Sequence, residues 1–359
     1  SLSGEVVLER RRYRCRRCGA WRTPADAVLC CGVHRMTRHL SKLVCQLATV
    51  EHFTRLEQLM ADQHGVPLAH DSMMKLVHDV GGVAEAQRLA EVQHWRDLPP
   101  DKRCWPEPEI TPARVHVSCD GIMYCTNEGE PDPQHPDSQR LIWKQMRVGC
   151  VYWQDDHEHW HKRVIWGQEE DYLSFATSLY RLACRCGYRQ AREKLFAADG
   201  GEWCWSIHQA YFADAEGILD WYHASEHVWD CGKALKEDSG QAAAWVHQAL
   251  SLMAEQGGEG LLNGLLAQRP ELRGSKRPAL DRLIHYVQPR LGRMDYPRYR
   301  ARNWPIGSGM IESTGKQLVG GRLKGPGMHW CPHGATAVTA LRTQDLNGRW
   351  HTFWKTLVI

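Results

Sequence analysis

Between residues 37 and 95, apolar residues recur at intervals of three and four, which places them on one face of a helix. Two such groups precede a Gly/Pro break, namely Leu40, Leu43, Val44 and Leu47, and then Phe53, Leu56, Leu59 and Met60. A short third helix is expected over residues 72–77, after the turn residues Gly65 and Pro67. This order predicts a helix-turn-helix arrangement, whose second helix would enter a DNA major groove. Any small helical bundle gives the same pattern, so both interpretations stay open.

From about residue 113 the pattern changes to segments rich in Val, Ile, Trp and Tyr with partial alternation, as expected for strands. Three consecutive strands are predicted at Arg114–Tyr124, Trp143–Tyr152 and His161–Trp166. A helix follows at about 169–184, then another before Asp199, and further strands are predicted at 203–212 and Ile218–Trp221. Residues 224–300 are mostly helical in pattern.

Three strands followed by alternating helix and strand are the order of an RNase-H-like fold. We therefore predict a multidomain α/β chain with an RNase-H-like catalytic core that carries a helical insertion. The Pro-rich segment 98–108 marks a linker before that core. The expected parts are a basic zinc-ribbon-like segment (1–36), a helical DNA-binding domain with linker (37–108), the first part of the core (109–225), the insertion (226–300), and the completion of the core with a basic tail (301–359).

Charge is distributed unevenly along the 359 residues. Residues 1–42 hold ten Lys or Arg against three Asp or Glu, and residues 271–359 hold fifteen against five. Two basic ends around an acidic middle predict a polyanion bound at two places, with solvated basic faces as the alternative. No stretch approaches the roughly 20 apolar residues of a membrane span. Fourteen Cys without a secretory signal predict a reducing cytoplasm.

Three carboxylates lie in segments of distinctive composition. Asp120 ends the apolar run 115–119 and precedes Gly121, while Asp199 closes the run 195–198 before two glycines. Glu312 follows a Gly-rich turn that is expected to open a helix. Two acids at strand ends and one on a late helix suit a two-metal phosphoryl-transfer site, because carboxylates are hard oxygen ligands for Mg²⁺. Asp-Gly is also an ordinary turn dipeptide, so each segment alone has a structural interpretation.

The basic N-terminal segment contains a possible zinc-ribbon pattern of cysteines. Cys15 and Cys18 form a C-x2-C pair, and Cys31 with His34 supplies a second pair that can close a tetrahedral Zn²⁺ site. Cys30 is an alternative to Cys31. Because the sequence begins at Ser1 rather than Met, we expect that N-terminal residues have been removed, and a different partner pair would lie there.

Several segments together resemble bacterial insertion-sequence transposases with an RNase-H-like DDE core, in the group akin to Mutator-like elements. The segments are Arg12–Gly19, Cys119–Gly121, Asp199–Trp203, Ile218–His227 and Gly307–Ser313, and the resemblance covers nearly the whole chain.

The resemblance implies that Asp120, Asp199 and Glu312 are the first, second and third catalytic acids. Asp220 competes for the second position, since it too follows an apolar run. We prefer Asp199, because Asp220 and His223 match an Asp-x-x-His signature that follows the second acid in this family. The pair would then support the site. The alternative is that Asp220 caps a helix and His223 faces the core.

The same resemblance implies two Mg²⁺ (or Mn²⁺) ions held by the three acids. One ion would activate a water that cuts a phosphodiester at the element's end, and the freed 3′-OH would attack target DNA. The expected partner is double-stranded DNA, both transposon ends and target. A homodimer is expected because two ends must be held together, and the location would be the bacterial cytoplasm at the nucleoid.

Basic residues outside the acid segments are candidates for DNA contact. In the Gly-rich C-terminal run, Arg322 and Lys324 would meet phosphates and Trp330 would stack on an unpaired base. Arg16 and Arg17 are the N-terminal candidates. Two other functions stay open: a structure-specific nuclease on the same fold, and a DNA-binding regulator in which the acids are inert.

Overall fold

The computed structural model describes residues 7, 9–25, 34–132, 138–169 and 172–357. A small antiparallel hairpin, β1 (Tyr13–Arg14) with β2 (Trp21–Arg22), opens the chain. Three helices follow: α2 (Arg38–Ala48), α3 (Phe53–His64) and α4 (His70–Asp97). Two of the helix ends are set by their capping residues. The Thr37 side chain accepts the backbone N–H of Leu40 at the start of α2, and Gly65 ends α3 in a left-handed conformation.

The predicted helical region is confirmed, with one difference. The short helix expected over residues 72–77 is part of the 28-residue α4, which contains the pair Gly81 and Gly82. At Gly81 the helix comes so close to the backbone of α13 that only glycine fits: an added Cβ would lie 2.3 Å from Ala337 O. Glycine inside a helix is normally unfavourable, and here it permits the closest approach of two helices from opposite ends of the chain.

A five-stranded mixed sheet forms the centre of the molecule, with strand order β5-β4-β3-β6-β7. The first three strands in sequence are antiparallel neighbours, whereas β6 pairs parallel with β3, and β7 parallel with β6. The bounds are Arg114–Pro131 for β3, Gln139–Gln154 for β4, Trp160–Gln168 for β5, Glu193–Ala198 for β6 and Glu216–Leu219 for β7. The three consecutive strands predicted from the sequence are confirmed.

Helices connect the parallel strands: α5 (Tyr172–Arg185) precedes β6, and α6 (Glu202–Tyr211) joins β6 to β7. The second helix predicted before Asp199 is wrong: that segment is the strand β6, and a short apolar run does not distinguish a strand from a buried helix. The strand predicted over 203–212 is also wrong. That segment is rich in Trp, which favours strands. Its buried residues Cys204, Trp205 and Ile207 nevertheless lie on one helical face, packed on the sheet.

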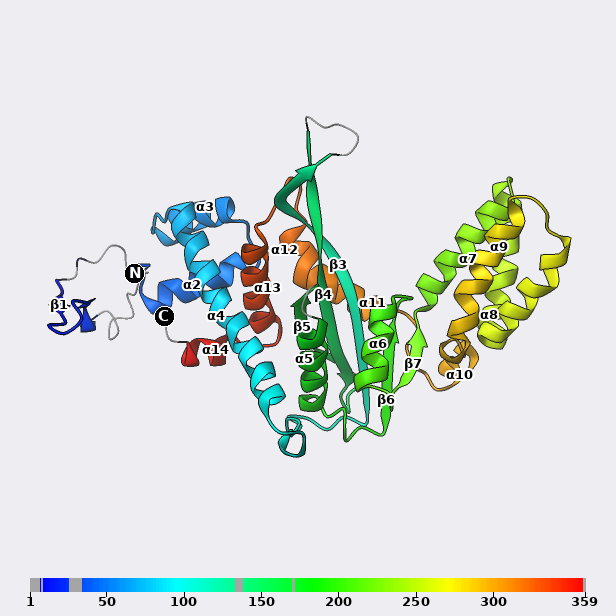
Figure 1. Cartoon of the computed structure of the whole chain (residues 1–359), viewed down its shortest axis with the longest axis horizontal. Helices are drawn as coiled ribbons and strands as arrows, with labels where there is room; N and C mark the ends of the chain where they lie inside the picture. Colours follow the sequence, from blue (N-terminus) through cyan, green and yellow to red (C-terminus); the bar gives the residue numbers. More distant parts are fainter. Residues whose placement is uncertain (1–6, 8, 26–33, 133–137, 170–171, 358–359) are drawn as a thin grey trace.

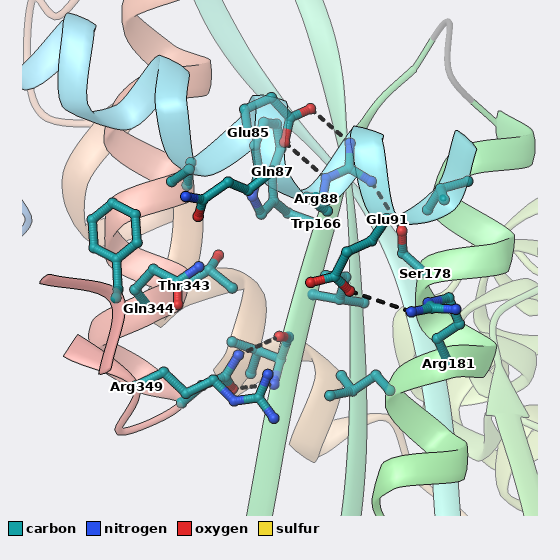
Figure 2. A pocket seen from close by; sticks show the side chains of 18 of the residues that line it. Glu85, Gln87, Arg88, Glu91, Trp166, Ser178, Arg181, Thr343, Gln344 and Arg349 are labelled. Carbon is teal, nitrogen blue, oxygen red and sulfur yellow. Dashed lines mark hydrogen bonds and ion pairs between the residues drawn. The ribbon is translucent and has the colours of Figure 1, made fainter. Parts of the chain in front are cut away.

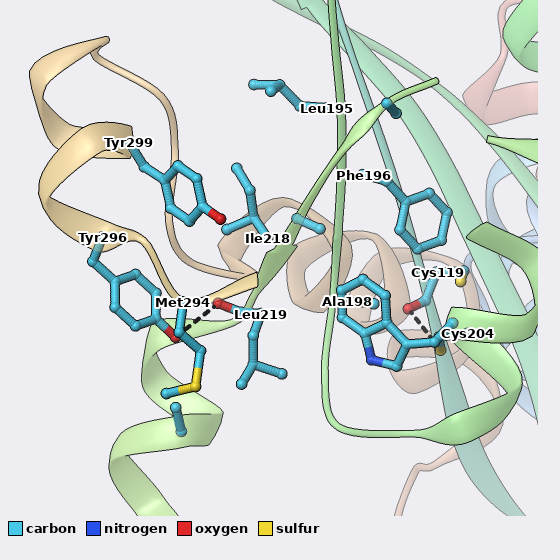
Figure 3. Close-up of a cluster of buried hydrophobic side chains, with 14 of the residues drawn as sticks. Cys119, Leu195, Phe196, Ala198, Cys204, Ile218, Leu219, Met294, Tyr296 and Tyr299 are labelled. Carbon is cyan, nitrogen blue, oxygen red and sulfur yellow. Dashed lines mark hydrogen bonds between the residues drawn. The ribbon is translucent and has the colours of Figure 1, made fainter. Parts of the chain in front are cut away.

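The region after β7 is helical, as predicted, and stands apart from the sheet (Figure 1). It comprises α7 (Trp221–Leu235), α8 (Ser239–Gln268), η2 (Arg269–Glu271), α9 (Lys276–Val287), η3 (Gln288–Arg293) and α10 (Tyr296–Ala301). Figure 3 shows where it meets β6 and β7: Tyr296 and Tyr299 pack beside Ile218 and Leu219, and the Tyr296 hydroxyl donates to Leu219 O at 3.1 Å. This core holds the ends of the two parallel strands in place.

The last segments return to the N-terminal helices. They are α11 (Gly309–Gly315), the π-helical turn η4 (Lys316–Gly320), α12 (Gly321–Leu323), α13 (Pro332–Leu346) and α14 (Trp350–Thr356). Figure 1 shows α13 and α14 beside α2 and α4, on the side of the sheet away from the helical insertion. One buried apolar cluster joins these helices to β4 and β5. Among the described residues, none of the helices is long and apolar enough to cross a membrane.

Candidate active site

Asp120 lies in the middle of β3, at the point where its parallel neighbour has ended. The β3–β6 pairing stops at Ser118, whereas β4 continues beside β3 as far as Pro131. The sequence pattern predicted Asp120 at a strand end. That is wrong, because β3 and β4 extend beyond the rest of the sheet as a two-stranded arm. Because the pairing with β6 ends at Ser118, Asp120 has no paired strand on that side of β3. The backbone N–H of Gly121 donates to Asp120 Oδ1 at 2.6 Å and orients the carboxylate.

Asp199 directly follows β6 and heads a tightly held turn. Its Oδ1 accepts the N–H of Gly201 at 2.9 Å, and its main-chain oxygen accepts the indole N–H of Trp205 at 2.8 Å. The helical insertion holds the same turn from the other side, since Arg290 Nη2 donates to Gly200 O at 3.1 Å. Sequence reasoning missed Arg290, because 90 residues separate it from its partner.

Glu312 lies in the first turn of α11, with an exposed side chain. The hydroxyl of Ser308 donates to Glu312 Oε1 at 2.6 Å, from the residue before the helix. Sequence reasoning did not assign Ser308 a role. The available signal was a Ser four residues ahead of an acid at a helix start, a spacing typical of side chains that meet across the first turn.

Asp220 follows β7 and is 4% exposed. It caps α7, accepting the backbone N–H of Tyr222 at 2.8 Å, so the capping interpretation of this residue is confirmed. His223 does not face the core. It is half-buried, with Nδ1 3.7 Å from Glu226 Oε2, on the first turn of α7.

These side chains line one cavity of about 160 Å³ at the end of the sheet. The lining residues are Cys119, Asp120, Asp199, Asp220, Tyr222, His223, Glu226, Ser308, Ile311 and Glu312. The structure thus brings together all five residues that the sequence singled out as catalytic or supporting. Five carboxylates face one imidazole, and neither Lys nor Arg occurs among the described residues that line the cavity.

Burial and the excess of negative charge both affect protonation. The pKa of Asp120 is raised to about 6, mainly by burial and in part by the charges of Asp199 and Glu312, while the Gly121 N–H and His223 oppose the rise. Burial also raises the pKa of Asp220, while hydrogen bonds from Ser308 and Tyr222 oppose the shift. The cavity therefore holds carboxylates whose charge is not compensated by protein cations.

Such a donor set fits a hard divalent cation. Carboxylate oxygens are the ligands that Mg²⁺ takes in proteins, and an ion would neutralise the charge that raises the pKa of Asp120. Within the described residues, no three His, Cys, Asp or Glu side chains already form a group that could hold a metal ion. The carboxylates line the cavity without converging on one point, so ion binding would require them to draw together.

The predicted DNA-contacting residues of the C-terminal run have different surroundings. Arg322 is 2% exposed; its Nε donates to Ala48 O at 2.8 Å and its guanidinium stacks on Trp330, 4.7 Å from the ring centre. Trp330 is itself buried and pairs through its backbone with the β3 arm. In this structure these two side chains hold the N-terminal helices to the core, so the predicted phosphate and base contacts are not available to them. Lys324 is exposed.

The N-terminal C-x2-C pair, Cys15 and Cys18, lies in a turn. Cys15 and Cys18 are exposed at the end of the β1–β2 hairpin, with Arg16 and Arg17 between them also exposed. Backbone N–H groups of Cys18 and Arg17 lower the pKa of the Cys15 thiol. Cys31 lies outside the described residues. His34 Nε2 is 3.1 Å from Asp79 Oδ2 on α4, so its partner here is an acid. The zinc site stays a prediction.

Comparisons with known proteins give little further information. No protein-family model matches the chain, and no curated protein matches it. Among solved structures, the chain is distantly similar to the Drosophila P element transposase strand transfer complex, with 8% sequence identity and a TM-score of 0.28. That similarity covers 93% of this chain and 85% of the other. At this identity and TM-score, the likeness carries no argument about the site.

Proposed function

We propose that the chain is a DNA transposase that cuts transposon ends and joins them to target DNA by metal-dependent phosphoryl transfer. The observation that carries the proposal is the meeting of Asp120, Asp199 and Glu312 at one cavity without a compensating Lys or Arg among its described lining residues. The three acids come from a strand, a strand-to-helix turn and a helix that are far apart in the sequence.

The sheet supports the proposal. Three antiparallel strands followed by two parallel ones, joined through helices, are what an RNase-H-like core would give, with Asp120 on its first strand. The helical insertion then lies between the second and third acids, where the pattern of apolar residues predicted it. Its contact through Arg290 to the Asp199 turn gives it a direct part in shaping the site.

In this proposal Asp120, Asp199 and Glu312 would hold two Mg²⁺ ions, with Mn²⁺ as a substitute. When bound, such a pair activates a water or hydroxyl nucleophile and stabilises the leaving 3′-oxygen. The protein's own contribution is orientation. Gly121 N–H fixes the Asp120 carboxylate, Gly201 N–H fixes that of Asp199, and the Ser308 hydroxyl fixes Glu312. Fixed donors of this kind spare the site from reorganising during the reaction.

Strand transfer tests the proposal directly. The substrates are a pre-cut duplex from the end of the DNA element that encodes the chain, and a supercoiled plasmid with Mg²⁺. Wild type should join them, whereas Asp120→Asn and Asp199→Ala should remove the product and leave duplex binding largely intact. Normal joining by Asp120→Asn would overturn the site. Loss with Asp220→Ala alone would move the second acid from Asp199 to Asp220.

The same assay separates the two other functions. Cutting without joining would indicate a nuclease, because the 3′-OH product is then never used as a nucleophile. Binding of the end with neither cutting nor joining, under Mg²⁺ or Mn²⁺, would indicate a DNA-binding regulator.

A further inference from the structure

The two ends of the described chain meet where α2 lies beside α14 (Figure 1). The Arg38 guanidinium donates to Trp354 O at the end of α14, and the Lys42 ammonium donates to His351 Nδ1 at 2.8 Å. The first contact satisfies a carbonyl that the end of a helix otherwise leaves unpaired. Residues 316 positions apart in sequence thus form one surface.

Between these helices runs a groove of about 440 Å³ whose lining is mostly Arg, Lys and His. It is lined by Arg38, His39, Lys42, His351, Trp354 and Lys355. None of these described lining residues is acidic, and neither α2 nor α14 contains an Asp or Glu. The groove thus offers uncompensated positive charge to an anion.

Helix stability does not account for this arrangement. The N-terminus of a helix carries the positive end of its dipole, so acids favour that end and cations disfavour it. The first turn of α2 contains no acid and begins with Arg38 and His39. Arg38 and His39 therefore act against the helix that carries them, which favours a role outside it, whereas Lys355 lies in the last turn of α14, where a cation is favourable.

Another cavity, lined by Arg88, Arg181, Arg185 and Arg349, is different in character. It has a volume of about 220 Å³ and lies between α4, α5, β5 and the C-terminal helices. Figure 2 shows its charges paired internally: Arg88 contacts Glu85 at 2.6 Å, and Arg181 contacts Glu91 at 3.4 Å. Arginines already matched by carboxylates attract an external anion much less than unmatched ones do.

The predicted recognition helix offers no comparable surface. On the exposed side of the first turns of α4, Lys75 stands between Asp71 and Asp79. A helix that meets the backbone of a polyanion would need an excess of positive charge, which this face lacks.

We propose that the α2–α14 groove binds the phosphate backbone of duplex DNA. The inference rests on the proposed function in taking DNA as the partner, and it concerns a surface separate from the acid cavity. Flexible lysine side chains contact phosphates without reading bases. The groove would therefore hold DNA in position, independently of sequence, whereas the acids carry out the chemistry.

The test compares two variants that remove equal charge. Lys42→Gln with Lys355→Gln alters the groove, and Lys75→Gln with Lys102→Gln alters exposed lysines elsewhere. Binding to a mixed-sequence duplex of about 30 base pairs is measured by fluorescence anisotropy in EDTA over a range of NaCl concentrations. Each phosphate contact contributes about 0.9 to the slope of log K against log salt. The groove variant should reduce the slope by about 1.8 and weaken binding about tenfold or more near 0.1 M salt. The control should leave both close to wild type.

Equal slopes for wild type and the groove variant would overturn the inference, as would equal weakening by the control. Because Lys42 contacts His351, the single variant Lys355→Gln, at an exposed position, repeats the test without disturbing that contact. The outcome is independent of catalysis. If the groove variant binds DNA and joins strands as wild type does, the groove proposal is wrong and the proposed transposase function stands. If the groove variant alone loses binding and wild type never joins strands, the groove proposal stands and the proposed transposase function is wrong.

Discussion

Gly81 and Gly82 are adjacent residues in α4 for which the structure predicts opposite effects of the same substitution. Alanine is favoured over glycine inside a helix by about 1 kcal/mol, so both changes begin with the same gain. At Gly82 the nearest atom to an added Cβ is His333 Cε1 at 3.7 Å, an ordinary contact. Gly82→Ala should therefore stabilise the chain by about 0.5–1 kcal/mol.

At Gly81 the added methyl would lie 2.3 Å from Ala337 O and 2.6 Å from Ala337 Cα. These are backbone atoms of α13, which cannot turn aside as a flexible side chain can. Overpacking of this kind costs about 1–3 kcal/mol, and more where backbone must move. Gly81→Ala should thus destabilise the contact between α4 and α13 by up to about 2 kcal/mol after the helix gain of about 1 kcal/mol is subtracted, and by more where backbone must move.

The measurement is the midpoint of urea unfolding for each variant, together with hydrogen exchange of the α4 and α13 amides. Gly81→Ala should lower the midpoint and speed exchange in both helices, while Gly82→Ala should raise the midpoint. If the two variants are equally stable, the close approach of α4 and α13 is not the reason for a glycine at residue 81.

Three further predictions concern pH, catalysis and metal. His116 is 3% exposed, and burial lowers its pKa from 6.5 to about 3. As pH falls through 6.5, the unfolded state takes up a proton on this residue and the folded state does not, so the folded state loses stability. His116→Phe should spare about 2 kcal/mol of the wild-type loss in unfolding free energy between pH 7.5 and 5, and parallel pH curves would contradict this. Ser308→Ala should slow strand transfer about tenfold with duplex affinity unchanged, and Ser308→Thr should restore most of the rate; equal loss in both variants would assign Ser308 a packing role. Cys15→Ser with Cys18→Ser should remove bound zinc, measured by elemental mass spectrometry, and should weaken binding to the transposon end more than joining of pre-cut DNA. Absence of zinc from the wild-type protein would contradict the predicted zinc site.

The sequence located the acids better than it described their surroundings. Apolar runs that end in Asp are a local signal, and they identified Asp120 and Asp199 without knowledge of the sheet. The predicted strand Arg114–Tyr124 already contained Asp120. The sequence did not indicate that β6 ends beside it, because that depends on the pairing of β3 with β6 rather than on β3 itself.

Long-range contacts account for the other differences. A Gly-rich basic run indicates phosphate binding in isolation, yet Arg322 is buried against Ala48 and Phe53, more than 260 residues earlier. No residue near Arg322 in the sequence indicates that Ala48 and Phe53 are its partners. The groove was equally hidden, since neither α2 nor α14 forms it alone.

The contact between the two ends of the chain also determines when the protein can finish folding during synthesis. The helices α2, α3 and α4 emerge from the ribosome early, but much of their apolar surface is covered by α13 and α14. At about 5–20 residues per second, the 316 residues that separate Arg38 from Trp354 take about 15–60 s to make. Throughout that interval the nascent chain exposes an apolar face and lacks the groove. A chain interrupted before α14 would therefore have its acids encoded but would lack the surface proposed to hold DNA.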